Sequence, residues 1–205
     1  GVKGIYAEKP LCCSMEEADM MVEVVQAHNI KFNYGTQRRF MPFFRQIRLL
    51  IDEGQIGNIQ CVIFQYGMSS ALWGLTHTAD MMLFMAGDPE VDFVQGSILC
   101  QESDWMGNRL NTDPPVTNSY IRFSNGVHGY STVGMGSEFE VSGTNGKLRI
   151  LNDGLDAQLR RVSEIDGTLD EVEFSKIDRK SGTLMGILDI AEALDQNTET
   201  KGPIY

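Results

Sequence analysis

Two side chains in this sequence are of types that could carry charge and protons for one small substrate. Lys9 lies in the segment GIYAEKP (residues 4–10), in which an apolar run ends in a charged pair and a proline. His77 lies in the segment THTAD (residues 76–80), at the head of an apolar stretch. An ammonium group stabilises developing negative charge, and an imidazole exchanges a proton near neutral pH. Together they favour acid–base chemistry at one site, provided that the fold brings the two residues together.

Each residue also has a simpler interpretation that the sequence leaves open. Lys9 can be a solvated lysine at a strand end, and His77 can be a buried histidine that packs against Trp73 at a helix start. Asp80 follows His77 by three residues, which places both side chains on one helical face. Asp80 could therefore orient the imidazole or simply offset the helix dipole, which itself disfavours an imidazolium at a helix N-terminus.

Composition and charge argue against several classes of partner. The 205 residues suggest one large or two small domains, with 42% apolar and 22% charged residues as in ordinary globular proteins. The 28 acidic and 17 basic residues give a net charge of −11, which argues against nucleic acid or an anionic membrane as a partner. No apolar run is long enough to span a bilayer. A small anionic ligand held by a local basic cluster stays compatible with this balance.

The cysteines and the start of the chain indicate a reducing compartment. Cys12, Cys13, Cys61 and Cys100 lack metal-like spacing, so we expect no metal site. We interpret all four as free thiols in the cytoplasm. The first residues are typical of a short strand rather than a signal peptide, although a processed or truncated start stays open.

The N-terminal segment predicts a strand–helix–strand unit. Val2 to Ala7 has the pattern of a buried strand, and Ile30 to Tyr34 has the pattern of a second. Ser14 and Glu17 form a capping-box pattern before a helix over about residues 14–28. No hairpin turn separates the strands, so we expect a right-handed crossover between parallel neighbours.

Helices and then strands are predicted further along the chain. Pro42 opens a helix, a strand covers residues 59–66, and another helix covers about 76–85. The later strands are expected at residues 91–99, 119–123, 127–133, 139–143, 147–151, 157–162 and 172–174, before a final helix over 184–194. Residues 101–118 are expected to form a long polar loop over a ligand site or an interface. The sequence therefore predicts an α+β fold, with a mainly antiparallel open sheet after the βαβ unit.

Five short motifs occur in one order along the chain. They are Glu8-Lys9-Pro10, Arg38-Arg39 followed by Pro42, residues 52–57 (DEGQIG), His77 with Asp80, and residues 143–147 (GTNGK). In this order they resemble the Gfo/Idh/MocA family of NAD(P)-dependent sugar and polyol oxidoreductases. The resemblance covers nearly the whole chain.

The resemblance implies a fold and a division into domains. Family members have an N-terminal Rossmann domain and then an α/β domain with a large open sheet, through which they commonly form dimers or tetramers. Residues 1–35 would be the C-terminal remnant of the dinucleotide-binding Rossmann domain. Residues 36–205 would be the substrate and oligomerisation domain, with helices on one face of its sheet. We expect a homodimer or homotetramer, because a large open sheet in a soluble protein must be covered.

The resemblance also implies catalytic and cofactor-binding residues. Lys9 would lie beside the nicotinamide and polarise the substrate oxygen, and His77 would be the acid–base residue, with Asp80 next to it. Glu8, Lys9 and Pro10 would border the cofactor, NAD or NADP. The substrate would be a small sugar or polyol.

Four side chains are candidates for contact with that substrate. Arg39 could bind a carboxylate or phosphate bidentately, or form surface salt bridges. Tyr66 could contact sugar hydroxyl groups. Trp105 could stack on a sugar ring or pack within its own loop. Trp73 stands four residues before His77, where the family pattern often carries an aspartate.

The sequence departs from the family pattern, and two hypotheses follow. The aspartate is replaced by Trp73, and no Gly-x-Gly-x-x-Gly turn follows a strand. We therefore expect the chain to be a fragment without the dinucleotide-binding loop. One hypothesis is an NAD(P)-dependent dehydrogenase acting on a hydroxyl carbon of a sugar, polyol or sugar derivative. The alternative is a non-catalytic ligand-binding or oligomerisation domain, a pseudoenzyme that lacks the nucleotide-binding half.

Overall fold

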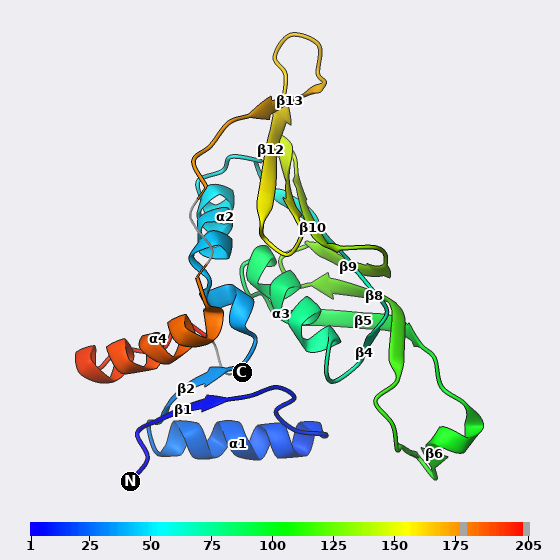
Figure 1. Cartoon of the computed structure of the whole chain (residues 1–205), viewed down its shortest axis with the longest axis vertical. Coiled ribbons are helices and arrows are strands. Elements are labelled where there is room, and N and C mark those ends of the chain that lie inside the picture. The colour runs from blue at the N-terminus through cyan, green and yellow to red at the C-terminus, as the bar shows by residue number, and fades with distance from the viewer. Residues whose placement is uncertain (177–179, 203–205) are drawn as a thin grey trace.

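The computed structural model describes residues 1–176 and 180–202, and it places a small N-terminal unit beside a large sheet (Figure 1). In the N-terminal unit, β1 (Gly4–Ala7) and β2 (Lys31–Tyr34) pair in parallel, with α1 (Met15–Ala27) between them in the chain. This confirms the predicted strand–helix–strand unit.

The start of α1 shows why this segment is helical. The Oγ of Ser14 accepts the backbone N–H of Glu17 at 3.2 Å, which satisfies one of the free donors of the first turn. The reciprocal bond of the predicted capping box is shifted by one residue, because the Glu17 carboxylate accepts the N–H of Cys13 instead. The predicted helix start is nevertheless confirmed.

The large sheet has nine strands, in the order β13-β12-β11-β10-β3-β9-β8-β4, with β5 also paired to β8. All neighbours are antiparallel except β3 and β9, which run parallel, so the mainly antiparallel open sheet is confirmed. The strands are β3 (Ile59–Tyr66), β4 (Ser69–Ser70), β5 (Val91–Ile98), β8 (Pro115–Phe123), β9 (His128–Val133), β10 (Ser137–Gly143), β11 (Gly146–Leu151), β12 (Asp156–Val162) and β13 (Leu169–Val172).

Two strand predictions need correction. β8 begins at Pro115 rather than at residue 119, because its first residues pair with β4 and with the end of β5. The predicted loop over 101–118 is therefore shorter. It also holds a short 3-10 turn, η2 (Glu102–Asp104), and a hairpin of β6 (Trp105–Met106) and β7 (Arg109–Leu110). β13 (Leu169–Val172) overlaps the predicted 172–174 only at Val172 and forms a hairpin with β12.

Two helices cover one face of the sheet and form the core with it (Figure 1). α2 (Pro42–Asp52) and α3 (Leu75–Ala86) bury their apolar sides against alternate residues of the strands. The fully buried side chains include Phe44 and Ile47 of α2, Met82 of α3, and Phe139 of β10. Helices on one face are thus confirmed.

The last helix returns to the N-terminal unit. α4 (Gly182–Gln196) packs against β1, β2 and the 3-10 turn η1 (Gln37–Phe40), and Figure 1 shows it across β1 and β2 from α1. The division expected at residue 35 assigned this helix to the second unit in sequence. In space, α4 lies against the strands of the first unit.

The described residues contain free cysteines and no helix that meets the requirements of a membrane-spanning segment. The cysteines at 12, 13, 61 and 100 are free thiols. Among the helices of residues 1–176 and 180–202, none has the length and apolar character that a membrane crossing needs.

Candidate active site

A pocket of about 220 Å³ lies where β1 ends and α3 begins. The 3-10 turn η1 and the end of β3 supply the other walls. The lining residues are Lys9, Gln37, Arg38, Phe64, Tyr66, Ser69, Trp73, Gly74, His77 and Thr78. The fold therefore brings together Lys9 and His77, which are far apart in the sequence.

Lys9 is held at the pocket by Trp73. Its Nζ donates to the Trp73 carbonyl oxygen at 2.7 Å and lies 3.2 Å from the centroid of the Trp73 ring. Desolvation lowers the pKa of Lys9 below its ordinary value, while the carboxylate of Glu8 opposes this shift. An ammonium has three donors, so the bond to Trp73 leaves others for a ligand.

His77 is kept neutral by its surroundings. It lies in the first turn of α3, where its backbone N–H donates to the Gly74 carbonyl at 3.1 Å. Burial, together with the charges of Arg38 and Lys9, lowers the pKa of His77 to about 4. Its Nδ1 is buried and has no hydrogen-bond partner among the described residues. The imidazole is therefore uncharged at neutral pH, as a proton acceptor must be.

Asp80 does not orient His77, which corrects one of its two predicted roles. The Oδ1 of Asp80 accepts a hydrogen bond from Nε of Arg39 at 2.7 Å, and its Oδ2 is buried with no hydrogen-bond partner among the described residues. Burial raises the pKa of Asp80 to about 6, although Arg39 beside it opposes the shift. The carboxylate is thus engaged by an arginine and makes no bond to the imidazole.

Arg39 is buried and is not among the residues that line the pocket, so its contact with substrate stays a prediction. The salt bridges of the alternative are present, in a buried rather than a surface position. Only 4% of Arg39 is exposed, and its guanidinium also donates to Asp88 at 3.0 Å. It therefore ties η1 to Asp80 within α3 and to Asp88 just beyond the end of α3. The neighbouring Arg38 lines the pocket instead, and its Nε donates to Asp153 at 2.6 Å. Successive residues of a 3-10 turn point about 120° apart, which sends the two arginines to different sides.

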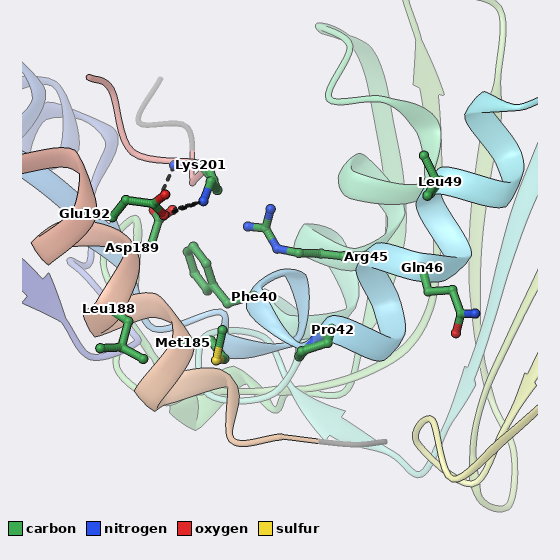
Figure 2. Close-up of a pocket in the computed structure, with 10 residues that line it drawn as sticks. All are labelled: Phe40, Pro42, Arg45, Gln46, Leu49, Met185, Leu188, Asp189, Glu192 and Lys201. Carbon is green, nitrogen blue, oxygen red and sulfur yellow. Dashed lines mark hydrogen bonds and ion pairs between the residues drawn. The ribbon is translucent and has the colours of Figure 1, made fainter. Parts of the chain in front are cut away.

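A second hollow of about 500 Å³ lies between α2 and α4 (Figure 2). Its ionic groups are largely paired, since Lys201 binds Glu192 at 2.7 Å and Asp189 at 3.6 Å. Arg45 lies over the ring of Phe40 at 5.8 Å. No histidine or cysteine is among its lining residues, so it lacks the acid–base group that the smaller pocket has.

Comparisons with known proteins show similarity to oxidoreductases. No family model matches the chain. The uncharacterized oxidoreductase YrbE of Bacillus subtilis is 26% identical over 222 residues, covering 97% of this chain and 63% of its own length. The myo-inositol 2-dehydrogenase of Thermotoga maritima is 24% identical over 166 residues, covering 71% of this chain and 48% of its own.

A solved structure shows the same fold. Levoglucosan dehydrogenase in complex with NADH superposes with a TM-score of 0.78 at 18% identity, over 97% of this chain and 66% of that one. The chain is similar to oxidoreductases of the inositol dehydrogenase and MocA type. It spans about two thirds or less of the length of these relatives.

The other predicted site residues are divided between the pocket and the surface. Tyr66 and Trp73 line the pocket, and the Lys9 ammonium lies on one face of the Trp73 ring. Trp105 lies in β6, outside the set of lining residues, so its predicted contact with substrate has no support here. Glu8 is exposed and accepts the backbone N–H of Lys9, and Pro10 follows, so their roles at a cofactor stay predictions.

Sequence reasoning missed Asp113, which fixes the turn that carries Trp73. The carboxylate of Asp113 accepts the backbone N–H groups of Leu72 at 2.7 Å and Trp73 at 3.0 Å. The end of the predicted 101–118 loop thus reaches the candidate site. Asp113 precedes two prolines, but its partners lie about forty residues earlier in the chain, so no local pattern identifies them.

Gly74 was also missed as a residue that shapes the pocket. A Cβ at this position would lie 1.4 Å from the Oγ of Ser69, so only glycine permits the close approach of β4 to the start of α3. The sequence shows a glycine before a helix, which is an ordinary pattern, and the reason for it lies in the tertiary contact.

Proposed function

We propose that the protein carrying this chain is an NAD(P)-dependent oxidoreductase that acts on a hydroxyl carbon of a sugar, a polyol or a sugar derivative. The observation that supports this most is that Lys9 and a neutral His77 line one pocket at the carboxyl end of β1. In open α/β sheets, ligands bind beyond the carboxyl ends of the strands. The names of the relatives, an inositol dehydrogenase and a levoglucosan dehydrogenase, agree with a polyhydroxylated substrate.

The chemistry assigned to the two residues is complementary. His77 accepts the hydroxyl proton while hydride leaves the carbon that bears the hydroxyl, and Lys9 stabilises the negative charge developing on the oxygen. In the reverse direction the imidazolium returns its proton to the carbonyl oxygen. The low pKa of His77 supports the first direction, because the imidazole is unprotonated before substrate binds.

A nicotinamide bound at the pocket would take or supply the hydride. Lys9 makes this fit plausible in chemical terms, since it follows β1 directly and its ammonium keeps donors free at the pocket. Glu8 and Pro10 flank it and would border the same group. The 205 residues contain no Gly-x-Gly-x-x-Gly turn that could cradle the phosphates of a dinucleotide.

A non-catalytic ligand-binding or oligomerisation domain is the second candidate, and one contact favours it. The Trp73 carbonyl and ring both engage the Lys9 ammonium, which is the group that charge stabilisation would need. If this contact persists with substrate bound, the pocket binds a ligand without turning it over.

We also propose a homodimer or homotetramer, located in the cytoplasm, that assembles through the open face of the sheet. Phe93 is 44% exposed and Tyr130 is 42% exposed, and both rings contact Tyr120 on the face that the helices leave uncovered. A patch of exposed aromatic rings is typical of a protein interface. Free thiols throughout the described chain suit a reducing compartment.

A substrate screen tests the enzyme proposal. The protein that carries this chain is incubated with sugars and polyols and with each oxidised nicotinamide, and the absorbance of the reduced form is followed. We expect turnover, and we expect Lys9→Met and His77→Asn each to lower kcat by about 100-fold or more. Arg109→Gln, an exposed arginine of the β6–β7 hairpin, is the control. Binding of a sugar without turnover would instead support the second candidate.

A further inference from the structure

We propose that this pocket selects a sugar derivative carrying an anionic group, a carboxylate or a phosphate, over a neutral sugar or polyol. The inference rests on the proposed function only for the sugar-like part of the ligand. The anionic part follows from the charges that line the pocket.

The pocket is cationic in a chain that is otherwise strongly acidic. Lys9 and Arg38 are among its lining residues, and none of the described lining residues is an aspartate or glutamate. The whole chain has a net charge of −11. After burial, the charges of these two cations also lower the pKa of His77, as a positive potential inside the pocket would.

The nearby carboxylates do not cancel both positive charges. Asp153 pairs with Nε of Arg38 and offsets one of them. Glu8 is exposed and accepts the backbone N–H of Lys9, and Asp113 accepts the N–H groups of the turn that carries Trp73. Lys9 itself is held by a carbonyl oxygen and an aromatic ring rather than by a carboxylate, so its charge is not neutralised by direct pairing.

Both cations keep donors for a ligand. Arg38 uses Nε on Asp153, and its two Nη groups make no hydrogen bond to any of the described residues. A guanidinium with free Nη groups suits two parallel bonds to a carboxylate or a phosphate. The Arg38 side chain is only 12% exposed, so such a bond would form in a partly desolvated place, where charge pairing is stronger than at an open surface.

The remaining walls suit the sugar part of the ligand. Gln37, Tyr66 and Ser69 offer neutral donors and acceptors for hydroxyl groups. The pocket volume of about 220 Å³ is below that of sites for drug-sized ligands, which matches a single sugar ring. Uronates, aldonates and sugar phosphates combine these two parts.

The test is a binding titration that needs no cofactor. Trp105→Phe leaves Trp73 as the single tryptophan of these 205 residues, and the fluorescence of Trp73 reports on the pocket wall. Glucuronate, glucose 6-phosphate and glucose are titrated separately at low and high salt. We expect at least one of the two anions to bind ten or more times tighter than glucose, and we expect this preference to shrink with salt. The anion that binds better distinguishes a carboxylate from a phosphate ligand.

Variants tie the preference to Arg38. Arg38→Gln should reduce anion binding at least tenfold, to about the affinity for glucose, and Arg38→Lys should retain part of it. Arg109→Gln is the matched control and should bind as the unmodified protein does. Equal binding of glucose and the anions, or no binding of either anion at millimolar concentration, would overturn the inference.

The outcome is separable from that of the enzyme screen. Tight anion binding without turnover of any substrate would refute only the proposed activity. Turnover of neutral polyols without an anion preference would refute only the proposed selectivity.

Discussion

His77 is the side chain whose behaviour depends most on what surrounds it. An ordinary histidine gains a proton near pH 6.5, whereas burial and two neighbouring cations lower the pKa of His77 to about 4. Between these values the unfolded chain binds a proton that the folded chain excludes. Folding is therefore favoured above pH 6.5 and loses stability as the pH falls toward 4. The pKa of Asp80 is raised to about 6, so below pH 6 the folded chain holds a proton on Asp80 that the unfolded chain lacks. This contribution favours folding as the pH falls toward the ordinary pKa of an aspartate, opposite to that of His77.

Replacing His77 should remove the part of the free energy of unfolding that is lost at acidic pH, and it should leave the contribution of Asp80 in place. When the pH is lowered from 7 to 4.5, we expect the free energy of unfolding to fall by roughly 2 kcal/mol more in the unmodified protein than in His77→Asn. Urea unfolding at the two pH values measures this difference. His28→Asn, at the exposed end of α1, is the control and should follow the unmodified protein. An unchanged pH dependence in His77→Asn would show that the imidazole is not buried as described.

At the scale of elements, one buried arginine connects the turn η1 to the middle of α3 and to the residues just beyond its C-terminal end. Arg39 pairs with Asp80 in the helix and with Asp88 just beyond it. This pairing sets where α3 begins relative to η1, and hence how far His77 lies from Arg38. The positions of the pocket residues therefore depend on an ion pair that does not itself reach the pocket.

Removing Arg39 should be costly because it leaves buried carboxylates without a cation. We expect Arg39→Met to lower the free energy of unfolding by about 3 kcal/mol, measured by urea titration. Lys176→Met removes one partner of the exposed Lys176–Asp156 pair and should cost less than about 1 kcal/mol. Adding Asp80→Asn to Arg39→Met should recover part of the loss. Equal losses in the two single variants would contradict the structural role.

The turn before α3 offers a second test of how elements shape the pocket. Gly74→Ala should destabilise by about 1–3 kcal/mol, because the new methyl group would overlap the Ser69 side chain. Ser69→Gly in the same chain should restore much of this, as in a double-mutant cycle. Gly67→Ala, where no atom lies within 4 Å of the added carbon, is the matched control. Thermal unfolding of the four variants distinguishes a local clash from a general intolerance of alanine.

At the scale of the whole molecule, the two faces of the sheet differ in chemistry. One face forms the core with α2 and α3. The other carries ion pairs such as Glu138–Arg149 and the aromatic rings of Phe93, Tyr120 and Tyr130. β5 is exposed along its whole length at the edge. This uncovered surface is the physical reason for expecting association of copies.

A charge on this face should prevent the proposed association. We expect the unmodified protein to sediment as a dimer or tetramer at micromolar concentration and Tyr130→Arg to weaken the association at least tenfold. Ile165→Arg, 94% exposed in the connection between β12 and β13, should not change it. A monomer at all concentrations in the unmodified protein would refute the proposal.

Local sequence patterns predicted most of the elements, since caps, turn glycines and apolar periodicity act over a few residues. Ser14 marked the start of α1, and Pro42 marked the start of α2. The misplaced bounds of β8 and β13 have a different origin. Pro115 and Leu169 become strand residues because partner strands pair with them, and a partner is not visible in the local pattern.

The sequence by itself determined which residue types were available for chemistry, and the order of Lys9 and His77 in a familiar set of motifs. Only the tertiary structure decided which side chains share a site. The side chain of Arg39 points into the core, where it pairs with Asp80, whereas that of Arg38 points toward the pocket. Asp113 binds the turn that carries Trp73. Side-chain direction, burial and charge pairing arise from contacts between elements distant in the chain, so neighbouring residues of one type acquire different roles.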